Sequence, residues 1–521
     1  MADADRIDPT FTDLPYRRLA DAALSRARDL GVTHADFRFE RVRYQHLSVR
    51  DGHLQGAEDV DDLGFAVRVI HHGAWGFASG VLLSTSEAVT IAEQAVNVAM
   101  VAAGMTRIPI ELAPEPIYPD VVWSSAYEIN PFEVPLGEKS ALLCDWTTRL
   151  TAAEGVEHAR AGLQQVLENK FYADLNGTVT TQQRIRLMPT LEAFGSREDR
   201  FDSMGTLAAP VGRGWEYVTE GYDFDNEIAE IPGLLREKLA APSVEPGAYD
   251  LVIDPTNLWL TIHESIGHAT ELDRALGYEA NYAGTSFATP DGLGTLQYGS
   301  ALMNITGDRT TPHGLSTVGF DDEGVAGQSW DIVKDGVLVG YQLDRPMAHT
   351  YGAVLNGGRS NGCAYADSPH HIPIQRMANV SLQPDPDGPD TAGLISQVER
   401  GIYVVGDKSW SIDMQRFNFQ FTGQRFYAIK DGQLDGQLRD VAYQATTTDF
   451  WGSMSAVGGP ETYLLHGAFN CGKAQPGQVA AVSHGCPSAL FRGVNVLNVA
   501  QESAQESAQD SAEQALEGED D

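Results

Sequence analysis

The stretch "YDLVIDPTNLWLTIHESIGHATELDRALG", residues 249–277, carries the strongest structural signal in this chain of 521 residues. It begins as an apolar strand at 249–253. Asp254 and Pro255 then mark a helix start, because Asp accepts hydrogen bonds from free N–H groups and Pro suits the first helical position. Apolar residues recur every four positions and predict the buried face of the helix: Leu258, Ile262 and Ile266. The stretch therefore predicts a rigid strand-to-helix unit.

Within this helix, His263-Glu264 and His268 form an H-E-x-x-x-H motif, one residue longer than the H-E-x-x-H motif of many zinc proteases. Five residues of a straight α-helix rotate by roughly 140°, so the two histidines would point apart. A π-type turn of about 4.4 residues brings them to roughly 50° apart, and Gly267 inside the interval eases that distortion. The motif fits either a metal site on a widened turn or three polar residues that fall together by chance.

A zinc site would need a third protein ligand. Zinc accepts His, Cys, Asp or Glu, and Glu271 and Asp273 follow the motif closely. A remote cysteine is the other possibility, and the chain has four: Cys144, Cys363, Cys471 and Cys486. The residues alone leave these alternatives open.

Charge and cysteine content narrow the setting. The chain has 36 basic and 72 acidic residues, a net charge of -36, whereas nucleic-acid binding needs clustered Lys and Arg. The absence of a C-x-x-C pair or a disulfide framework favours a reducing cytoplasm. The polar start "MADADRIDPT" is unlike a signal peptide, and no run of about 18 apolar residues predicts a membrane span. We therefore expect a cytoplasmic protein with no nucleic-acid or membrane partner.

The first half of the chain mixes strands and helices. Apolar and polar residues alternate over 36–90, which predicts strands, and helices are predicted at 84–103 and 136–152. Two hairpin turns are predicted, at Asp51-Gly52 and Asn176-Gly177. This pattern predicts an α+β fold with antiparallel strands rather than repeated βαβ units.

Pro and Gly cluster at 231–248, and we place a domain boundary there. The second domain is rich in strands, with hairpin turns predicted at 334–336 and 430–432, and it carries the metal-site helix. The predicted division is an N-terminal tail, an N-terminal α+β domain, a C-terminal domain that contains the histidine motif and a disordered acidic tail: 1–14, 15–240, 241–500 and 501–521.

Four blocks of sequence, taken together, resemble the TldD branch of the TldD/PmbA family. They are "HESIGHATE" at 263–271, "FDDEGVAGQSWDIVKDGVLVGYQLD" at 320–344, "NGGRSNGCAYADSPHHIPIQRMANV" at 356–380 and "FNCGKAQPGQ" at 469–478. The strand-rich opening is similar to the N-terminal domain of that family. The resemblance covers roughly residues 15–500, and the set of blocks is far more specific than the short histidine motif.

The resemblance implies a zinc metallopeptidase. His263 and His268 match the two ligand histidines, Cys471 matches the distant third ligand, and Glu264 matches the catalytic acid/base. Two imidazoles and one thiolate leave zinc an open fourth position for water, and Glu264 could take a proton from that water. The family also implies a dimer, either of identical chains or with a metal-free PmbA/TldE-type relative.

Other histidines and cysteines are weaker candidates. His370 and His371 lie between prolines in a loop and fit an exposed pair better than a substrate contact. His466 and His484 flank Cys471 in sequence and could orient the metal ligands. The remaining thiols are expected to be ordinary buried or surface groups: Cys144, Cys363 and Cys486.

The expected function is zinc-dependent hydrolysis of unfolded or extended peptides, with Glu264 as general base. An extended peptide could add to a strand edge through main-chain hydrogen bonds, which gives weak sequence preference. The alternative is a non-catalytic peptide-binding or regulatory subunit in which the metal is structural.

Overall fold

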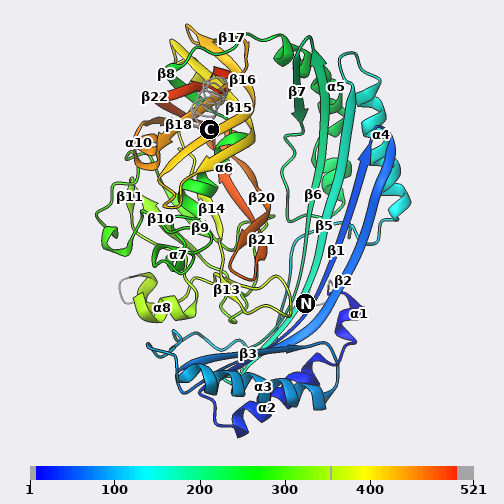
Figure 1. The fold of residues 1–521 in the computed structure, drawn as a ribbon, viewed down its shortest axis with the longest axis vertical. Coiled ribbons are helices and arrows are strands. Elements are labelled where there is room, and N and C mark those ends of the chain that lie inside the picture. Colours follow the sequence, from blue (N-terminus) through cyan, green and yellow to red (C-terminus); the bar gives the residue numbers. More distant parts are fainter. Residues whose placement is uncertain (1–6, 352–354, 502–521) are drawn as a thin grey trace, which may run out of the picture.

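A long N-terminal sheet and a C-terminal body that lies against one face of it make up the molecule (Figure 1). This computed structural model describes residues 7–351 and 355–501. Residues 502–521, nearly all of the segment expected to be a disordered acidic tail, lie outside the described residues. Among the described helices, none has the length and apolar character needed to cross a membrane.

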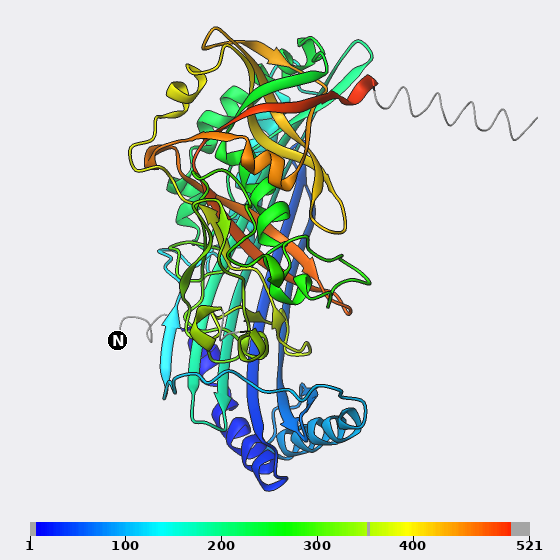
Figure 2. The same ribbon diagram turned by 90° about the vertical axis from the view of Figure 1, so that its left-hand side faces the viewer.

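The N-terminal sheet has seven strands in the order β3-β2-β1-β5-β6-β4, with β7 beside β6. The strands are β1 (His34–Arg50), β2 (His53–His71), β3 (Ala74–Gly80), β4 (Val121–Ser124), β5 (His158–Asp174), β6 (Val179–Arg197) and β7 (Arg200–Gly205). The four longest have 17 or 19 residues and run most of the length of the molecule (Figure 2). The two predicted hairpin turns join β1 to β2 and β5 to β6, as expected.

Alternation along β1 divides the sheet into an apolar face and a polar face. Phe37 and Phe39 pack against two helices at one end, and Leu47 and Val49 pack against two others at the far end. The helices on this half are α1 (Pro9–Thr12), α2 (Tyr16–Asp29), α3 (Thr85–Ala103), α4 (Leu136–Thr151) and α5 (Phe224–Ala240). Helices α3 and α4 confirm the two predicted ones. The polar face is left for the C-terminal body.

Two segments differ from the sequence-based expectation. Pro232 was counted among the residues that mark a domain boundary at 231–248, but it lies inside α5, because the helix buries an apolar stripe that includes Ile231 and Leu235 against the sheet. That burial outweighs the hydrogen bond that proline removes. Within the expected tail 1–14, Phe11 of α1 is fully buried against Phe39 and Tyr16, so this turn belongs to the folded body.

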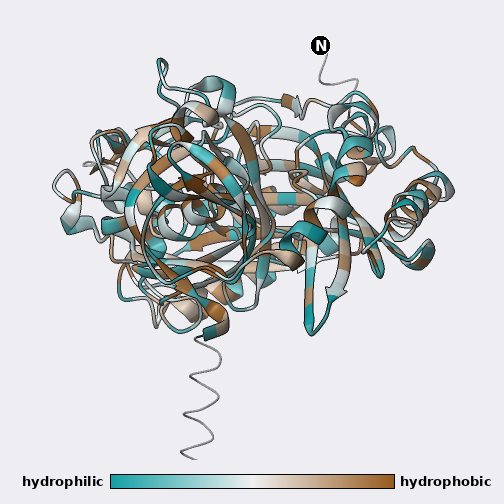
Figure 3. Ribbon diagram, turned by 90° about the horizontal axis from the view of Figure 1, so that it is seen from above, coloured by the Kyte–Doolittle hydropathy of each residue, from teal (hydrophilic) through white to brown (hydrophobic). Residues whose placement is uncertain are grey.

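The C-terminal body is built on a closed sheet. Strand order is β15-β8-β22-β18-β16-β17, with β19 beside β22, and β15 also pairs with β16, so the sheet closes on itself. Seen from above, these strands form a ring (Figure 3). They are β8 (Gly247–Ile253), β15 (Arg400–Ile412), β16 (Asn418–Lys430), β17 (Gln433–Leu438), β18 (Val441–Thr446), β19 (Met454–Val457) and β22 (Ala489–Asn498).

Smaller elements complete the C-terminal body, and most of them lie below this ring in Figure 1. A four-stranded sheet has the order β11-β10-β9-β14, and β12-β13 and β20-β21 are separate hairpins. These strands are β9 (Ile305–Asp308), β10 (Ser329–Lys334), β11 (Val337–Leu338), β12 (Ala364–Tyr365), β13 (Ile374–Gln375), β14 (Asn379–Leu382), β20 (Leu464–Lys473) and β21 (Gln478–Cys486). The helices are α6 (Pro255–Ile262), α7 (Leu272–Ala275), α8 (Arg345–Tyr351), α9 (Thr391–Ile395) and α10 (Thr447–Gly452). The turns predicted at 334–336 and 430–432 are present, and the α+β prediction is confirmed.

Buried charges line the contact between the long sheet and the C-terminal body, and we call this group the interface ion cluster. Five basic and five acidic side chains take part, each with an oppositely charged neighbour within 4 Å. They are Arg38, Arg68, Lys170, Arg184, Arg186, Asp36, Glu40, Glu168, Asp322 and Glu323. The polar face of the sheet is therefore buried through ion pairs rather than apolar packing.

Candidate metal centre

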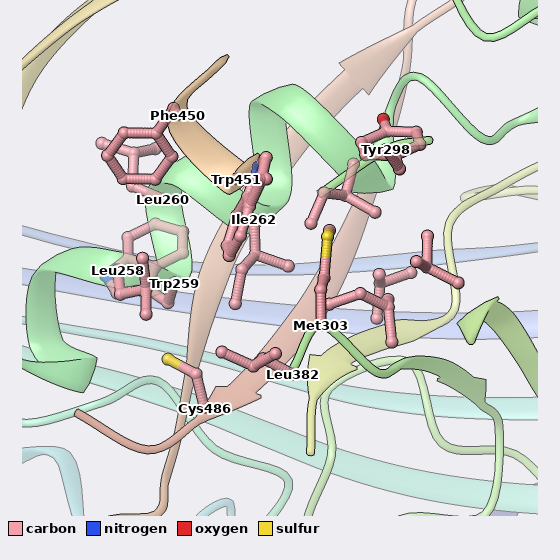
Figure 4. Packing of buried hydrophobic residues seen from close by; sticks show 14 of the residues in the cluster. Leu258, Trp259, Leu260, Ile262, Tyr298, Met303, Leu382, Phe450, Trp451 and Cys486 are labelled. Atoms are coloured by element: carbon pink, nitrogen blue, oxygen red, sulfur yellow. The ribbon is translucent and has the colours of Figure 1, made fainter. Parts of the chain in front are cut away.

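Helix α6 places the histidine motif at the centre of the C-terminal core. Asp254 accepts a hydrogen bond from the Thr256 N–H at 3.0 Å and Pro255 occupies the first helical position, as the sequence predicts. All eight residues of α6 are buried, and Leu258 and Ile262 pack among residues from distant segments such as Trp451 (Figure 4). This packing fixes the position of the C-terminal end of α6, which His263 directly follows.

The helix widens to a π-turn at His263–Gly267. The N–H of His268 donates to the carbonyl oxygen of His263 at 3.0 Å, five residues back. Carbonyl oxygens in the widened turn find other partners, because Tyr298 Oη donates to Ser265 O at 2.5 Å and Gln342 Nε2 donates to Gly267 O at 2.7 Å. A side chain on Gly267 would collide with Met377, 2.5 Å from its Cβ position. The π-turn places the ring centres of His263 and His268 4.7 Å apart.

Cys471 reaches the same point from β20, more than 200 residues later in the chain. The register of β20 against β21 shifts between Ala468 and Cys471, and such bulges commonly redirect a side chain beside a site. Arg376 fixes the local backbone, because its Nη2 donates to Cys471 O at 2.5 Å. The bulge and this bond orient the thiol toward His268.

The three side chains fit a zinc ion. Their donor atoms all lie within 4.8 Å of one another, and Cys471 Sγ is 3.6 Å from His268 Nε2. Zinc bonds of about 2.0–2.1 Å to nitrogen and about 2.3 Å to sulfur, at tetrahedral angles, separate N and S by about 3.6 Å. Among residues 7–351 and 355–501, this is the one group of three or more His, Cys, Asp or Glu side chains with such spacing.

His268 is held by a carboxylate on its far side. Its Nδ1 lies 2.9 Å from Glu271 Oε2, and Glu271 also accepts from Arg274 Nε and Lys473 Nζ, both at 3.1 Å. Burial would raise the pKa of Glu271, but Lys473 and Arg274 hold it well below its usual value. The ionised carboxylate accepts the Nδ1–H of His268, which leaves Nε2 with a free lone pair toward Cys471.

His263 is held by a second histidine. Its Nδ1 lies 2.7 Å from His484 Nε2, and His484 Nδ1 lies 2.8 Å from the carbonyl oxygen of Val380. A carbonyl can only accept, so His484 donates from Nδ1 and accepts at Nε2. His263 therefore donates from Nδ1 and presents Nε2 as a lone pair. Burial also lowers the pKa of both His263 and His268, which favours the neutral rings that a metal needs.

The thiol of Cys471 is poised toward its anionic form. Burial alone would raise its pKa, but His268 and Arg376 lower it, and the net direction is downward. A thiolate is the form that binds metal. A metal bound here would take two neutral imidazoles and one thiolate as its donors.

Glu264 lies beside these donors but outside the group of three. Its Oε2 accepts a hydrogen bond from Arg416 Nη1 at 2.6 Å, and its side chain is buried. A buried carboxylate that is held by a cation and adjoins His263 in sequence is a candidate general base.

The structure separates the other sequence candidates from the donors. Glu271 and Asp273, the alternative third ligands, point to Lys473 instead, whose Nζ lies 2.8 Å from Asp273. His466 stacks on Trp259 with ring centres 5.0 Å apart, and burial lowers its pKa to about 4. The loop pair His370 and His371 pairs with nearby aspartates of the protein. The other cysteines are free thiols away from the site: Cys144, Cys363 and Cys486.

Sequence reasoning missed three of the basic residues around the site. Arg274 and Lys473 each sit close in sequence to a predicted residue, three positions after Glu271 and two after Cys471, so spacing could have suggested them. Arg416 lies in a hairpin loop with no recognisable motif, and only the closed sheet brings it to Glu264.

Comparison with known proteins gives a consistent family assignment. Residues 246–498 match the PmbA/TldA metallopeptidase C-terminal domain, and residues 35–99 match PmbA/TldA metallopeptidase domain 1. A metalloprotease of Methanothermobacter thermautotrophicus is 27% identical over 469 residues, covering 89% of this chain and 95% of that protein. A zinc metalloprotease TldD homolog of Saccharolobus solfataricus is 22% identical over 479 residues, covering 91% and 98%.

Solved structures share the fold. TldE from Thermococcus kodakarensis superposes with a TM-score of 0.64 at 15% identity, over 92% of this chain and 99% of that one. A Thermotoga maritima protein proposed as a modulator of a DNA gyrase superposes with a TM-score of 0.74 at 16% identity, over 92% and 100%. The chain belongs to the TldD/PmbA family.

Proposed function

We propose that this protein is a zinc-dependent peptidase of the TldD branch. The observation that carries the proposal is the convergence of His263, His268 and Cys471 on one point with Glu264 beside them. The metalloprotease names of its relatives support the same conclusion. A structural zinc site normally has four protein ligands, whereas three converge here in the described part of the chain.

Each residue has a defined task in this proposal. Zinc, held by His263, His268 and Cys471, would polarise the scissile carbonyl group and lower the pKa of water. Glu264 takes a proton from the attacking water and later gives it to the leaving amine nitrogen. Glu271 and His484 keep the Nε2 lone pairs of the two histidines directed at the metal.

Unfolded or extended peptides are the proposed substrates. Two loops meet beside the site, since Thr285 N donates to Met414 O at 2.7 Å and Arg416 bridges Ala283 and Glu264. These loops carry large side chains exposed to solvent: Tyr278, Tyr282 and Met414. Such side chains could bind an extended peptide without demanding one sequence.

We further propose a cytoplasmic dimer, formed by two copies or with a metal-free PmbA/TldE-type relative. The fold shared with TldE supports a partner of that kind, and four free cysteines suit a reducing compartment. Light scattering of the purified protein, alone and mixed with such a relative, tests this. A fully active monomer would contradict it.

Exchange of Glu264 for glutamine tests the enzymatic proposal. Glu264→Gln keeps the size of the side chain but cannot accept the proton, so peptide hydrolysis should fall by about 10²–10⁴-fold. Zinc content should stay at the wild-type value. The control is Glu461→Gln, an exposed residue of the short 3-10 helix at Pro460–Thr462, which should change neither activity nor zinc.

Near-normal turnover of Glu264→Gln with intact zinc would rule out the mechanism. The alternative, a non-catalytic peptide-binding or regulatory subunit with a structural metal, would then become the leading explanation.

A further inference from the structure

Arg416 has an unusual backbone conformation in the loop between β15 and β16. Its φ is 63°, a left-handed region that arginine rarely adopts. The conformation is held at both ends, because Arg416 N donates to Asp413 O at 3.1 Å and Thr447 Oγ1 donates to Arg416 O at 2.8 Å. Strained residues of this kind cluster at functional sites, where the surrounding structure enforces them. The loop therefore aims one side chain in a fixed direction.

The Arg416 guanidinium points at the reacting end of the candidate metal centre. Its Nη1 donates to Glu264 Oε2 at 2.6 Å and its Nη2 donates to the carbonyl oxygen of Ala283 at 3.0 Å. Its Nε is buried and has no hydrogen-bond acceptor within the described part of the chain. A buried donor without a partner is costly, so its retention calls for an explanation. One N–H group of the guanidinium is thus without a protein partner in the described part of the chain.

The other cations around the site are already committed elsewhere. Arg274 and Lys473 neutralise Glu271 on the far side of His268. Arg376 donates to main-chain oxygens at Cys471 and Gln478, and although its Nε, like that of Arg416, has no acceptor in the described part of the chain, Arg376 does not contact Glu264 there. Over residues 7–351 and 355–501, Arg416 is the ion-pair partner of Glu264. It is therefore the positive charge placed beside the residue that would move the proton.

We propose that Arg416 is a second catalytic residue, which stabilises the negative charge that develops on the scissile carbonyl oxygen; this rests on the proposed peptidase function. In the step that it assists, the water oxygen bonds to the carbonyl carbon and the water proton passes to Glu264. The π electrons of the carbonyl move onto its oxygen, to which Arg416 donates. The oxygen electrons then re-form the carbonyl bond, the C–N bond breaks with its electron pair going to nitrogen, and Glu264 delivers the proton to that nitrogen.

The chemistry of arginine suits this role. Protonation of Glu264 removes the negative charge that Arg416 faces, at the moment when a new negative charge forms on the substrate oxygen. A guanidinium has several N–H donors in fixed directions, so it can remain hydrogen-bonded to Glu264 and also donate to the substrate oxygen. Prearranged donors in a buried site stabilise such a charge far more than water does.

The test measures kinetics, zinc content and inhibitor binding for Arg416→Ala, Arg416→Lys and Arg416→Gly. Glycine is the residue that best tolerates the left-handed backbone, so this variant removes the side chain and preserves the loop. Gln415→Ala, the exposed neighbour in the same loop, is the control. For an internally quenched peptide, kcat should fall about 10²–10³-fold in the Ala and Gly variants, with KM within a few-fold of wild type. Lysine should restore part of kcat.

A binding measurement separates catalysis from architecture. A phosphinic peptide carries a tetrahedral anion at the place of the scissile carbonyl, so its affinity should fall in parallel with kcat in the Arg416 variants. The affinity of the uncleaved peptide, measured in the Glu264→Gln background, should be unchanged. Zinc content should match that of the Gln415→Ala control, whereas the melting temperature should fall in the Ala and Gly variants because Glu264 loses its buried partner.

Several results would overturn the proposal. One is wild-type kcat in Arg416→Gly, and another is loss of zinc in all three variants, which would show a structural role. A third is a rise of KM alone that is confined to peptides with a free C-terminal carboxylate and absent for amidated ones. If the wild-type protein itself hydrolyses no peptide, the proposed function fails first, and that outcome is distinct from the three above.

Discussion

The interface ion cluster and the candidate metal centre are both buried and both rich in charge, yet they are built differently. In the cluster, each charge faces an opposite charge, as Glu168 does with Arg184 at 2.9 Å and Arg186 at 2.8 Å. At the metal centre, the donor atoms of His263, His268 and Cys471 converge on one another. The charged side chains contact these residues from the outside, as Glu271 does at His268 with Arg274 behind it.

This difference distinguishes buried charges that stabilise the fold from buried side chains that can bind a metal. Donor atoms whose lone pairs face one another can bind a cation between them. Charged groups that are already paired have no free charge with which to bind an ion. The cluster should therefore control stability without affecting the metal, and residues behind the donors should control the metal more than stability. Each of the following experiments can break that division.

The largest effect is expected from Glu168 in the interface ion cluster. Glu168→Gln leaves the guanidinium groups of Arg184 and Arg186 without their carboxylate, and breaking a buried pair in this way costs about 3–5 kcal/mol. Denaturant titration should show the loss in unfolding free energy, and zinc per chain should not change. The matched control is Asp59→Asn, which breaks a partly exposed pair with Arg43 on the same sheet and should cost about 0–1 kcal/mol. Equal losses for the two variants would contradict the account.

A smaller effect, but one on the metal, is expected from His484. His484→Ala removes the acceptor that fixes the Nδ1–H of His263 and should weaken zinc binding by about 10–100-fold. A chromogenic chelator competition assay measures this affinity. The control His466→Ala removes another buried histidine, which stacks on Trp259 and touches none of the donors, so zinc affinity should stay at the wild-type value. The division fails if both variants lose zinc to the same extent.

The smallest effect concerns the pH dependence of Glu40 in the cluster. Burial raises its pKa to about 7, and neither of its carboxylate oxygens accepts a hydrogen bond within the described residues. The folded state therefore holds this proton more tightly than the unfolded state, and the stabilisation is full at low pH and lost as the pH rises through about 7.

Glu40→Gln should accordingly match wild type in unfolding free energy near pH 4 and exceed it near pH 8.5. Denaturant titrations at the two pH values measure the difference. Lower stability of the variant at the higher pH would show that the pairing of Glu40 with Arg38 and Lys170 outweighs its burial.

Local sequence patterns predicted the individual helices, strands and turns well. They did not predict that the C-terminal sheet closes into a ring. The cap at Asp254, helices α3 and α4 and the Asp-Gly turns depend on neighbours a few residues apart, and each could be read directly. The ring of strands depends on the pairing of β15 with both β8 and β16, for which no local pattern exists. Pro232 misled the expectation because its helix is held by tertiary packing rather than by propensity.

The site shows the same limit. His263, Glu264 and His268 share one motif, and Cys471 was assigned through family resemblance, since nothing near it in sequence points to a metal. Glu271 shows how a correct residue type can take a different role: it faces the Nδ1 side of His268 instead of the converging donors, because Arg274 and Lys473 fix it there. The contact of Arg416 with Glu264 could not be predicted from the sequence, because it depends on the folded arrangement of distant segments.

X-ray absorption at the zinc edge of the purified protein tests the central claim most directly. The account predicts about one zinc per chain with two nitrogen ligands at about 2.0–2.1 Å and one sulfur ligand at about 2.3 Å. In Cys471→Ala, the sulfur signal and most of the bound zinc should disappear. A wild-type zinc shell without sulfur, or full zinc occupancy in Cys471→Ala, would contradict the account.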